Sequence, residues 1–598
     1  MRNLDTLISK SISDACNELF GFRPDEKQIS IQSTRSEFEG ERTVVVFPFT
    51  RQAKKSPEET GAAIGKYLVE NQEVVTDFGV VKGFLNLSIS DKYWASALSS
   101  AVLEKNCFGL QPLGSKPQVM VEYSSPNTNK PLHLGHLRNI FLGYSVSNIL
   151  KAAGHDVVKV QIINDRGIHI CKSMIAWKLY GGGETPTSTG EKGDKFVGRY
   201  YVAFDKQYKI EISELLSSGC DQKTAEAEAP ILLAARELLH KWEAGDSDVR
   251  ELWSTMNGWV YDGFEYTYTE MGVDFDKLYY ESDTYLIGKD QIEKGVTSGA
   301  FIRREDGSVW IDLSDVGLDE KLLLRKDGTA VYMTQDIGTA ILRFEEYPNL
   351  DRQVYTVGNE QEYHFKVLFE ILDKLGFSQA SRCHHLSYGM VELPEGKMKS
   401  REGTVVDADD IMAEMKTTAE QLARDAGKLE NIPEEDRESL FKDVGYGALK
   451  YFLLKVDPKK SMMFDPAASI DFIGNTGPYI QFNYVRARSI LRNAGIEDVA
   501  SLLPLSPVHL DDTERSLLMS ALSLPGIIEE AAHSYDPSLV ANLCYDITKS
   551  YSSWYQNHPI LNEEDDQVRT ARLALCALSS SAVKIGMSLL GVSMPEKM

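Results

Sequence analysis

Short apolar runs alternate with helical patterns through the middle of the chain. One run predicts a strand at residues 118–124, a helical spacing follows over about 135–153 and ends at Gly154, and a second run predicts a strand at 157–163. A repeat of two residues indicates a strand, and a repeat of 3.6 indicates a helix. Strand, helix and strand in this order predict a right-handed βαβ unit.

The same alternation returns later in the chain. It predicts a strand at 352–357, a helix at 364–375 that Gly376 closes, and a strand near 385–391. Between the two halves, residues 181–300 are helical and rich in loops, which indicates an insertion. The predicted fold class of this part is α/β, with a doubly wound parallel sheet of the Rossmann type.

The two ends of the chain have different patterns. Residues 1–110 predict a small α/β domain, with an amphipathic helix at its start and strands at 43–49 and 83–89. From about residue 445 only helical periodicity remains, which predicts an all-helical C-terminal domain. The predicted boundaries are 1–110 for the N-terminal domain, 117–400 for the α/β domain, 401–465 for a loop and linker, and 466–598 for the helical domain.

Composition and charge narrow the class of protein. The chain has 598 residues, 42% hydrophobic and 25% charged, as in a soluble protein of three or four domains. It contains no run of 18 apolar residues and no signal-like start, so we expect a cytoplasmic protein without membrane contact. Seven scattered cysteines lack zinc spacing, so no metal site is predicted. The net charge of −24 argues against a general nucleic-acid binder.

The strongest chemical motif lies between the first predicted strand and helix of the α/β domain. Residues 124–136 end in His133-Leu134-Gly135-His136. Two histidines three apart at a helix start share a face, and Gly135 leaves room for a nucleotide against the backbone. Cationic or hydrogen-bonding imidazoles placed there stabilise charge that develops on a phosphate. The alternative is a helix start with structural histidines.

A second motif follows the last predicted strand. Residues 394–403 read Pro-Glu-Gly-Lys-Met-Lys-Ser-Arg-Glu-Gly, with cations at Lys397, Lys399 and Arg401. Such a loop can close over a triphosphate and neutralise it in the transition state. When this motif is considered alone, a basic surface loop without a catalytic function is the commoner explanation of its cations.

Together these motifs resemble the class I aminoacyl-tRNA synthetases, and the surrounding sequence is similar to the arginyl-tRNA synthetases over nearly the whole chain. The similarity includes Tyr-Ser-Ser-Pro-Asn with Lys130 before His133, and the stretches at 327–336, 358–361 and 475–482. The resemblance implies activation of L-arginine with ATP and Mg²⁺ to arginyl-adenylate and pyrophosphate. Transfer to the 3′-terminal adenosine of tRNA(Arg) follows. The resemblance also implies that the enzyme has no prosthetic group and is a monomer.

The resemblance also implies which residues form the site. A guanidinium is a planar fork of donors that carboxylates match bidentately, and lysine would leave part of such a site unpaired. Ser125 and Asn127 would face the amino-acid head group. The implied catalytic residues are His133, His136, Lys130, Lys397 and Arg401; for ATP, His133, Gly135, His136 and Met398; for arginine, Glu122, Ser125, Asn127, Tyr332, Asp336 and Gln361; and for tRNA, Tyr479, Gln481, Tyr484, Arg486 and Arg488.

The chain departs from the family pattern at three places. Ser400 stands where class I loops normally carry a second Lys, a function that Lys130 is expected to take over. Lys399 stands where Ser is usual, and Arg166 stands where Trp is usual. These departures leave the role of Lys399 and the packing around Arg166 open.

Binding of RNA has to overcome an acidic background. Residues 466–598 carry nine Lys and Arg against fifteen Asp and Glu, so local phosphate contacts must suffice. The N-terminal domain resembles one that touches the tRNA elbow. Two rival interpretations remain: another class I synthetase, and a non-catalytic tRNA-binding paralogue. Retention of both histidines, Lys130 and Lys397 speaks against the second.

Overall fold

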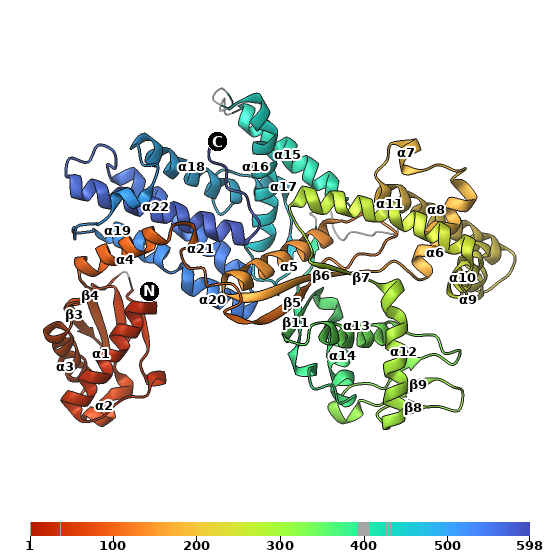
Figure 1. Ribbon diagram of the computed structural model, residues 1–598, viewed down its shortest axis with the longest axis horizontal. Helices are drawn as coiled ribbons and strands as arrows, with labels where there is room; N and C mark the ends of the chain where they lie inside the picture. The colour runs from red at the N-terminus through yellow and green to blue at the C-terminus, as the bar shows by residue number, and fades with distance from the viewer. Residues whose placement is uncertain (1, 36, 393–405, 426–428, 430–431) are drawn as a thin grey trace.

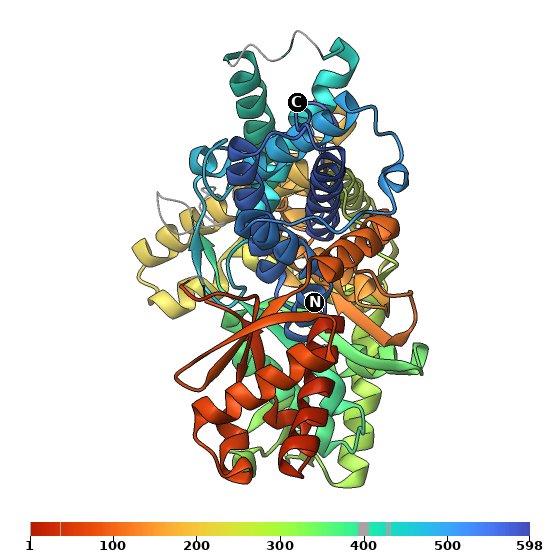
Figure 2. The same cartoon turned by 90° about the vertical axis from the view of Figure 1, so that its left-hand side faces the viewer.

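The computed structural model describes residues 2–35, 37–392, 406–425, 429 and 432–598. Figure 1 shows an N-terminal α/β domain below a bundle of helices, with the central sheet beside that bundle. Two lobes extend from the sheet on its far side. Figure 2 shows the N-terminal sheet and its helices toward the viewer, beneath the helical domain.

The N-terminal domain is a four-stranded antiparallel sheet of order β1-β2-β4-β3. The predicted strand at 43–49 is too long, because β2 ends at Val45 and Phe47 starts a helix with Pro48 in its first turn, where proline is tolerated. β1 and β3 were not predicted. The elements are α1 (Arg2–Phe20), β1 (Ile31–Ser33), β2 (Arg42–Val45), α2 (Phe47–Ala53), α3 (Pro57–Asn71), β3 (Val75–Val81), β4 (Phe84–Ile89) and α4 (Asp91–Glu104).

The central sheet has five parallel strands in the order β12-β11-β5-β6-β7. The chain runs outward from β5 to β7 and then returns to the other side of β5. The switch point therefore lies between β5 and β11, where open α/β sheets bind ligands. The predicted fold class is confirmed. The elements are β5 (Lys116–Glu122), α5 (Leu134–Ala152), β6 (His155–Ile163), β7 (Lys277–Tyr280), β11 (Leu350–Gly358), α14 (Glu362–Lys374) and β12 (Cys383–Tyr388).

The region predicted as an insertion, 181–300, is not wholly outside the sheet. β7 lies inside this range and pairs with the end of β6 from Val160 to Ile163. Most of the rest is helical, and α8, α10 and α11 pack on α6, which ends just before this range. The helices of this lobe are α6 (Ile168–Tyr180), α7 (Pro186–Thr189), α8 (Gly193–Ser217), α9 (Gln222–Glu228), α10 (Pro230–Glu243) and α11 (Ser247–Met271).

A second lobe follows β7, in which α12 (Glu281–Ser298) packs against α13 (Tyr332–Glu346). The chain segment that joins these two helices forms a small antiparallel sheet that the sequence did not predict. Its strands are β8 (Ile302–Arg303), β9 (Val309–Ile311) and β10 (Lys321–Leu324).

The C-terminal part is helical, with one exception. β14 (Met462–Met463) pairs in parallel with β13 (Val391–Glu392), a short strand pair that the helical periodicity did not predict. The helices are α15 (Ala408–Asp425), α16 (Glu434–Leu454), α17 (Pro466–Ser469), α18 (Gly477–Asn493), α19 (Asp512–Leu522), α20 (Leu524–Ser534), α21 (Pro537–Asn557) and α22 (Asp566–Leu589).

Among the described helices, α22 alone is long and apolar enough to cross a membrane. Its most apolar 18-residue window is 78% buried, because α22 is the core helix of the C-terminal bundle.

The helical bundle packs directly on α5, the helix that begins at the histidine motif. Helices α16, α20, α21 and α22 all contact α5. Arg138, which is 2% exposed, donates to the carbonyls of Pro458 at 3.1 Å and Lys460 at 2.8 Å. The start of α5 is therefore fixed on one side by the sheet and on the other by the bundle.

Candidate active site

The chain turns sharply where β5 ends. Ser124 and Ser125 both have positive φ, +74° and +46°, a backbone conformation that residues other than glycine rarely adopt. The side chain of Asn139 in α5 accepts from the backbone N–H of Ser124 at 2.6 Å, and Asn164 donates to the carbonyl of Ser125 at 3.1 Å. These contacts hold a strained turn at the switch point, where Ser125 is half-buried and Asn127 is exposed.

The two histidines of the motif form a reciprocal cap on α5. Nδ1 of His133 accepts from the N–H of Gly135 at 3.2 Å, and Nδ1 of His136 accepts from the N–H of His133 at 3.1 Å. Because both Nδ1 atoms accept, each ring carries its proton on Nε2. The ring centres lie 3.9 Å apart. The pair thus presents two fixed N–H donors.

Both rings are neutral. Burial, with a further effect of Lys130, lowers the pKa of His133 to about 3. Burial also holds the pKa of His136 well below its ordinary value, with smaller effects of His133 and Lys130. Of the two predicted forms, cationic and hydrogen-bonding, the structure supports the second.

A cavity of about 340 Å³ opens beside this pair. Lys130 and His133 line it from the motif, Lys195 and Arg199 from α8, and Asp407 from the start of α15. Burial raises the pKa of Asp407 to about 6. The predicted loop residues Lys397, Met398 and Arg401, together with Lys399 and Ser400, lie outside the described residues.

Glu122 already has a partner. It is 6% exposed and forms an ion pair with Arg343, which is fully buried, and Ser125 Oγ donates to its other oxygen at 3.2 Å. The sequence-based idea that Glu122 is free to match a substrate guanidinium bidentately does not fit this geometry, since a resident guanidinium holds it.

The other residues predicted to bind arginine gather at the carboxyl ends of the strands. Tyr332 and Asp336 lie one turn apart on α13, and Gln361 follows β11 on an exposed turn. Tyr332 is 70% exposed and is not a core residue. Asp336 receives a hydrogen bond of 2.6 Å from His364 Nε2.

One carboxylate at this edge was missed. Glu281 is the first residue of α12, directly after β7, and is 7% exposed. Burial raises its pKa to about 7, and the charges of Asp165 and Asp336 add to this, while Arg166 and Gln335 act against it. Its position after a parallel strand was the available signal, hidden because β7 fell within the range read as an insertion.

The predicted tRNA-binding residues of α18 divide into two groups. Gln481 is fully buried and donates to the carbonyls of Asp443 at 2.9 Å and Ser593 at 2.8 Å. Tyr484 is 3% exposed and donates to Glu596 at 2.7 Å. Direct tRNA contact by these two side chains does not fit their burial. Tyr479, Arg486 and Arg488 remain partly exposed.

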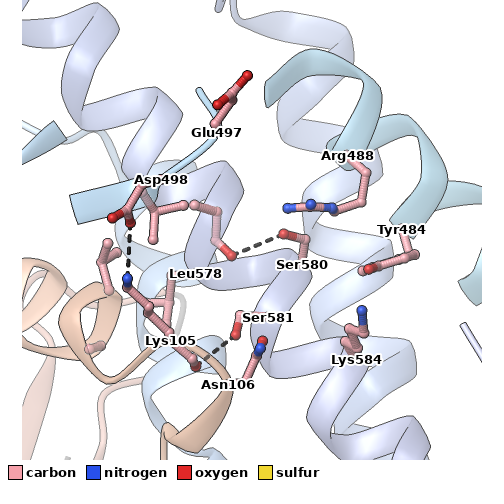
Figure 3. A pocket seen from close by; sticks show the side chains of 14 residues that line it. Lys105, Asn106, Tyr484, Arg488, Glu497, Asp498, Leu578, Ser580, Ser581 and Lys584 are labelled. Atoms are coloured by element: carbon pink, nitrogen blue, oxygen red, sulfur yellow. Dashed lines mark hydrogen bonds and ion pairs between the residues drawn. The ribbon is translucent and has the colours of Figure 1, made fainter. Parts of the chain in front are cut away.

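Arg488 lies on a cavity of about 290 Å³ between α18, α22 and the end of α4 (Figure 3). Its Nε donates to Glu596 at 3.0 Å, and Lys584 contacts the same carboxylate at 3.1 Å. The guanidinium carbon of Arg486 lies 5.0 Å from the ring centre of Phe482 and 5.1 Å from that of Tyr555. The C-terminal Glu596 therefore orders the basic side chains of this face.

Three protein families match consecutive parts of the chain. They are tRNA synthetases class I (R), catalytic domain, over residues 97–465, the DALR anticodon binding domain over 480–598, and the Arginyl tRNA synthetase N terminal domain over 6–89. The chain belongs to the arginyl-tRNA synthetase family. Its helical domain is accordingly of the anticodon-binding type, and the family predicted from the motifs is confirmed.

Full-length relatives agree. The chain is 51% identical to the arginine–tRNA ligase of Bacteroides thetaiotaomicron and 52% identical to that of Parabacteroides distasonis, with all of each chain covered. The solved Thermus thermophilus arginyl-tRNA synthetase matches with a TM-score of 0.78 and 25% identity over both full lengths. This similarity speaks against both rival interpretations, another class I synthetase and a non-catalytic paralogue.

Proposed function

We propose that this chain, an arginine–tRNA ligase, binds the guanidinium of L-arginine between Glu281 and Asp336. Tyr332 and Gln361 complete this pocket. The observation that carries the proposal is the state of Glu281: a buried carboxylate whose pKa is raised to about 7 beside a second carboxylate. A cationic substrate relieves both the burial penalty and the repulsion.

The head group of arginine points toward the turn after β5. Ser125 and Asn127 contact it, and Glu122, oriented by Arg343, stands behind Ser125. The carboxylate of arginine then lies at the start of α5, next to the two histidines.

ATP enters with Mg²⁺ and lies against Gly135. The Nε2–H groups of His133 and His136 donate to its phosphate oxygens, and Lys130 lies at the α-phosphate. A carboxylate oxygen of arginine attacks the α-phosphorus, the bond to the bridging oxygen breaks, and pyrophosphate leaves. Lys397 and Arg401 act on this leaving group and Met398 binds ATP, as the family resemblance implies. Fixed dipoles suit this step, because they require no reorganisation as charge develops.

In the second step a ribose hydroxyl of the terminal adenosine attacks the arginyl carbonyl carbon, and AMP leaves. Tyr479, Arg486 and Arg488 bind the anticodon loop through stacking and phosphate contacts. The N-terminal domain contacts the tRNA elbow. The enzyme acts as a cytoplasmic monomer and needs bound tRNA for efficient activation.

Calorimetric titration of arginine and lysine into the chain, with a nonhydrolysable ATP analogue and tRNA present, tests the pocket. Binding of arginine with release of heat, and no binding of lysine at the same concentrations, supports it. Equal affinity for the two amino acids contradicts it, since lysine lacks the planar fork of donors.

A further inference from the structure

Arg166 is held in a closed setting beside the proposed arginine pocket. Its side chain is 10% exposed, and Nη2 lies 2.8 Å from Glu243, the last residue of α10. Its guanidinium lies 4.1 Å from the ring centre of Tyr285 in α12 and 5.4 Å from that of Trp242. Two aromatic rings and one carboxylate therefore fix this cation, and such contacts strengthen where water is excluded.

The same guanidinium faces Glu281 without binding it. Nη1 of Arg166 lies 3.9 Å from Glu281 Oε1, beyond hydrogen-bond distance. Glu243 takes the shorter contact and holds Arg166 back. Glu281 thus feels a fixed positive charge from Arg166. Apart from its hydrogen bond with Gln335, its oxygens are left for a guanidinium ligand.

We propose that Arg166 is a positioning residue, which keeps Glu281 ionised for the substrate guanidinium without occupying the pocket itself. The inference rests on the proposed arginine pocket.

The groups that face Glu281 come from several elements. Asp165 and Arg166 precede α6, Gln335 and Asp336 lie on α13, Glu243 reaches Arg166 from α10, and His364 of α14 holds Asp336. Among the groups named here, Arg166 is the cation that acts on Glu281, and it lowers the pKa of Glu281. Without it, that pKa moves further above 7. Because binding of a cation requires the carboxylate, arginine binding then weakens as the pH falls below this higher value.

Arg166→Met removes the charge and keeps most of the side-chain length. The experiment measures KM and kcat for arginine in ATP/pyrophosphate exchange with tRNA, from pH 6 to 8.5. The ratio of KM in the variant to KM in the parent enzyme is expected to be about eightfold at pH 6.5 and to fall toward one at pH 8.5, which corresponds to one unit of pKa. Arg166→Lys restores most of the parent profile.

Arg250→Met is the matched control. Arg250 stacks on the same Trp242, at 3.6 Å, and donates to its carbonyl at 2.8 Å. A role limited to packing around Trp242 predicts similar, pH-independent changes in both variants, and that result would overturn the inference.

Glu243→Gln gives a second test that keeps Arg166 in place. It releases Arg166 toward Glu281, so KM for arginine is higher at every pH because Arg166 competes for the carboxylate. The further rise of KM at low pH shifts to a lower pH, opposite in sign to Arg166→Met. An unchanged profile in this variant contradicts the inference, even where Arg166→Met does not fold.

Glu281→Gln separates this inference from the pocket on which it rests. A parent-like KM for arginine in Glu281→Gln means that the pocket itself is wrong. A raised KM there, with parent-like pH profiles in the Arg166 and Glu243 variants, means that the pocket stands and that Arg166 has no such role.

Discussion

The backbone N–H of His133 donates to Nδ1 of His136, 3.1 Å away, so the second histidine of the motif caps the helix that the first one begins. Nδ1 of His133 in turn accepts a hydrogen bond from the backbone N–H of Gly135. A capping box normally uses Ser or Thr with Glu. Here the cap itself sets the tautomer of both rings, and the same bonds that start α5 aim two Nε2–H donors at the phosphate site.

Loss of one donor is expected to slow adenylate formation strongly. His136→Ala should reduce kcat for exchange by about 10²- to 10³-fold, with a small change in KM for arginine, because the donor acts on charge that develops in the transition state. Single-turnover adenylate formation measures this step. His155→Ala is the control, since His155 is half-buried at the amino end of β6, opposite the strand ends where the site lies. Equal effects of the two substitutions would refute the role of His136.

The neutral state of both rings predicts a flat pH dependence. With a pKa of about 3 for His133, and a pKa for His136 that burial holds well below its ordinary value, neither ring gains a proton between pH 6 and 8. At saturating arginine, kcat for exchange should not change with the protonation of a histidine over this range. A rise in kcat as the pH drops through 6.5 would indicate imidazolium catalysis instead.

Removal of the buried carboxylate should affect substrate binding. Glu281→Gln is expected to raise KM for arginine about ten- to hundredfold, since a hydrogen bond to a charged partner contributes about 1.5–3 kcal/mol. Selectivity for arginine over lysine should fall as well. Glu293→Gln lies on the same helix, where Glu293 pairs with Arg303 near the surface, and serves as the control. A parent-like selectivity in Glu281→Gln would exclude this residue from the pocket.

The Glu122–Arg343 pair should be important for stability. Arg343→Met leaves Glu122 charged and buried without its partner, which costs about 3–5 kcal/mol. The midpoint of thermal unfolding should drop clearly, and Arg343→Met with Glu122→Gln should recover part of the loss. An unchanged midpoint in the single variant would mean that the pair is not formed.

The two groups of residues on α18 should respond differently. Arg488→Ala is expected to raise KM for tRNA several-fold with an unchanged KM for ATP, because a phosphate contact is lost. Gln481→Ala should instead lower the unfolding midpoint, since two buried carbonyls lose their donor. The reverse pattern would restore the sequence-based assignment of Gln481.

Local patterns predicted the elements around the motif well. The strand at 118–124 and the helix at 135–153 correspond to β5 and α5 within two residues, because an apolar run and Gly154 mark their limits. The motif was placed correctly between the first strand and the first helix of the sheet. β7 was missed because Lys277–Tyr280 is four residues long, shows no clear alternation and lies after a long helical stretch.

Long-range pairing explains the rest. No residue near Glu122 in the sequence indicates that Arg343 is its partner, because Arg343 lies on α13, far away along the chain. Only the folded chain shows that this carboxylate already forms an ion pair. Likewise α18 carries aromatic and polar residues on more than one face. The C-terminal residues Ser593 and Glu596 decide which face is buried, by accepting from Gln481 and Tyr484.

ATP/pyrophosphate exchange with each of the twenty amino acids, run with and without tRNA, tests the central claim most directly. The account predicts exchange with arginine alone, rising sharply when tRNA is added. Exchange driven equally well by another amino acid, or no exchange with arginine while tRNA is bound, would contradict it.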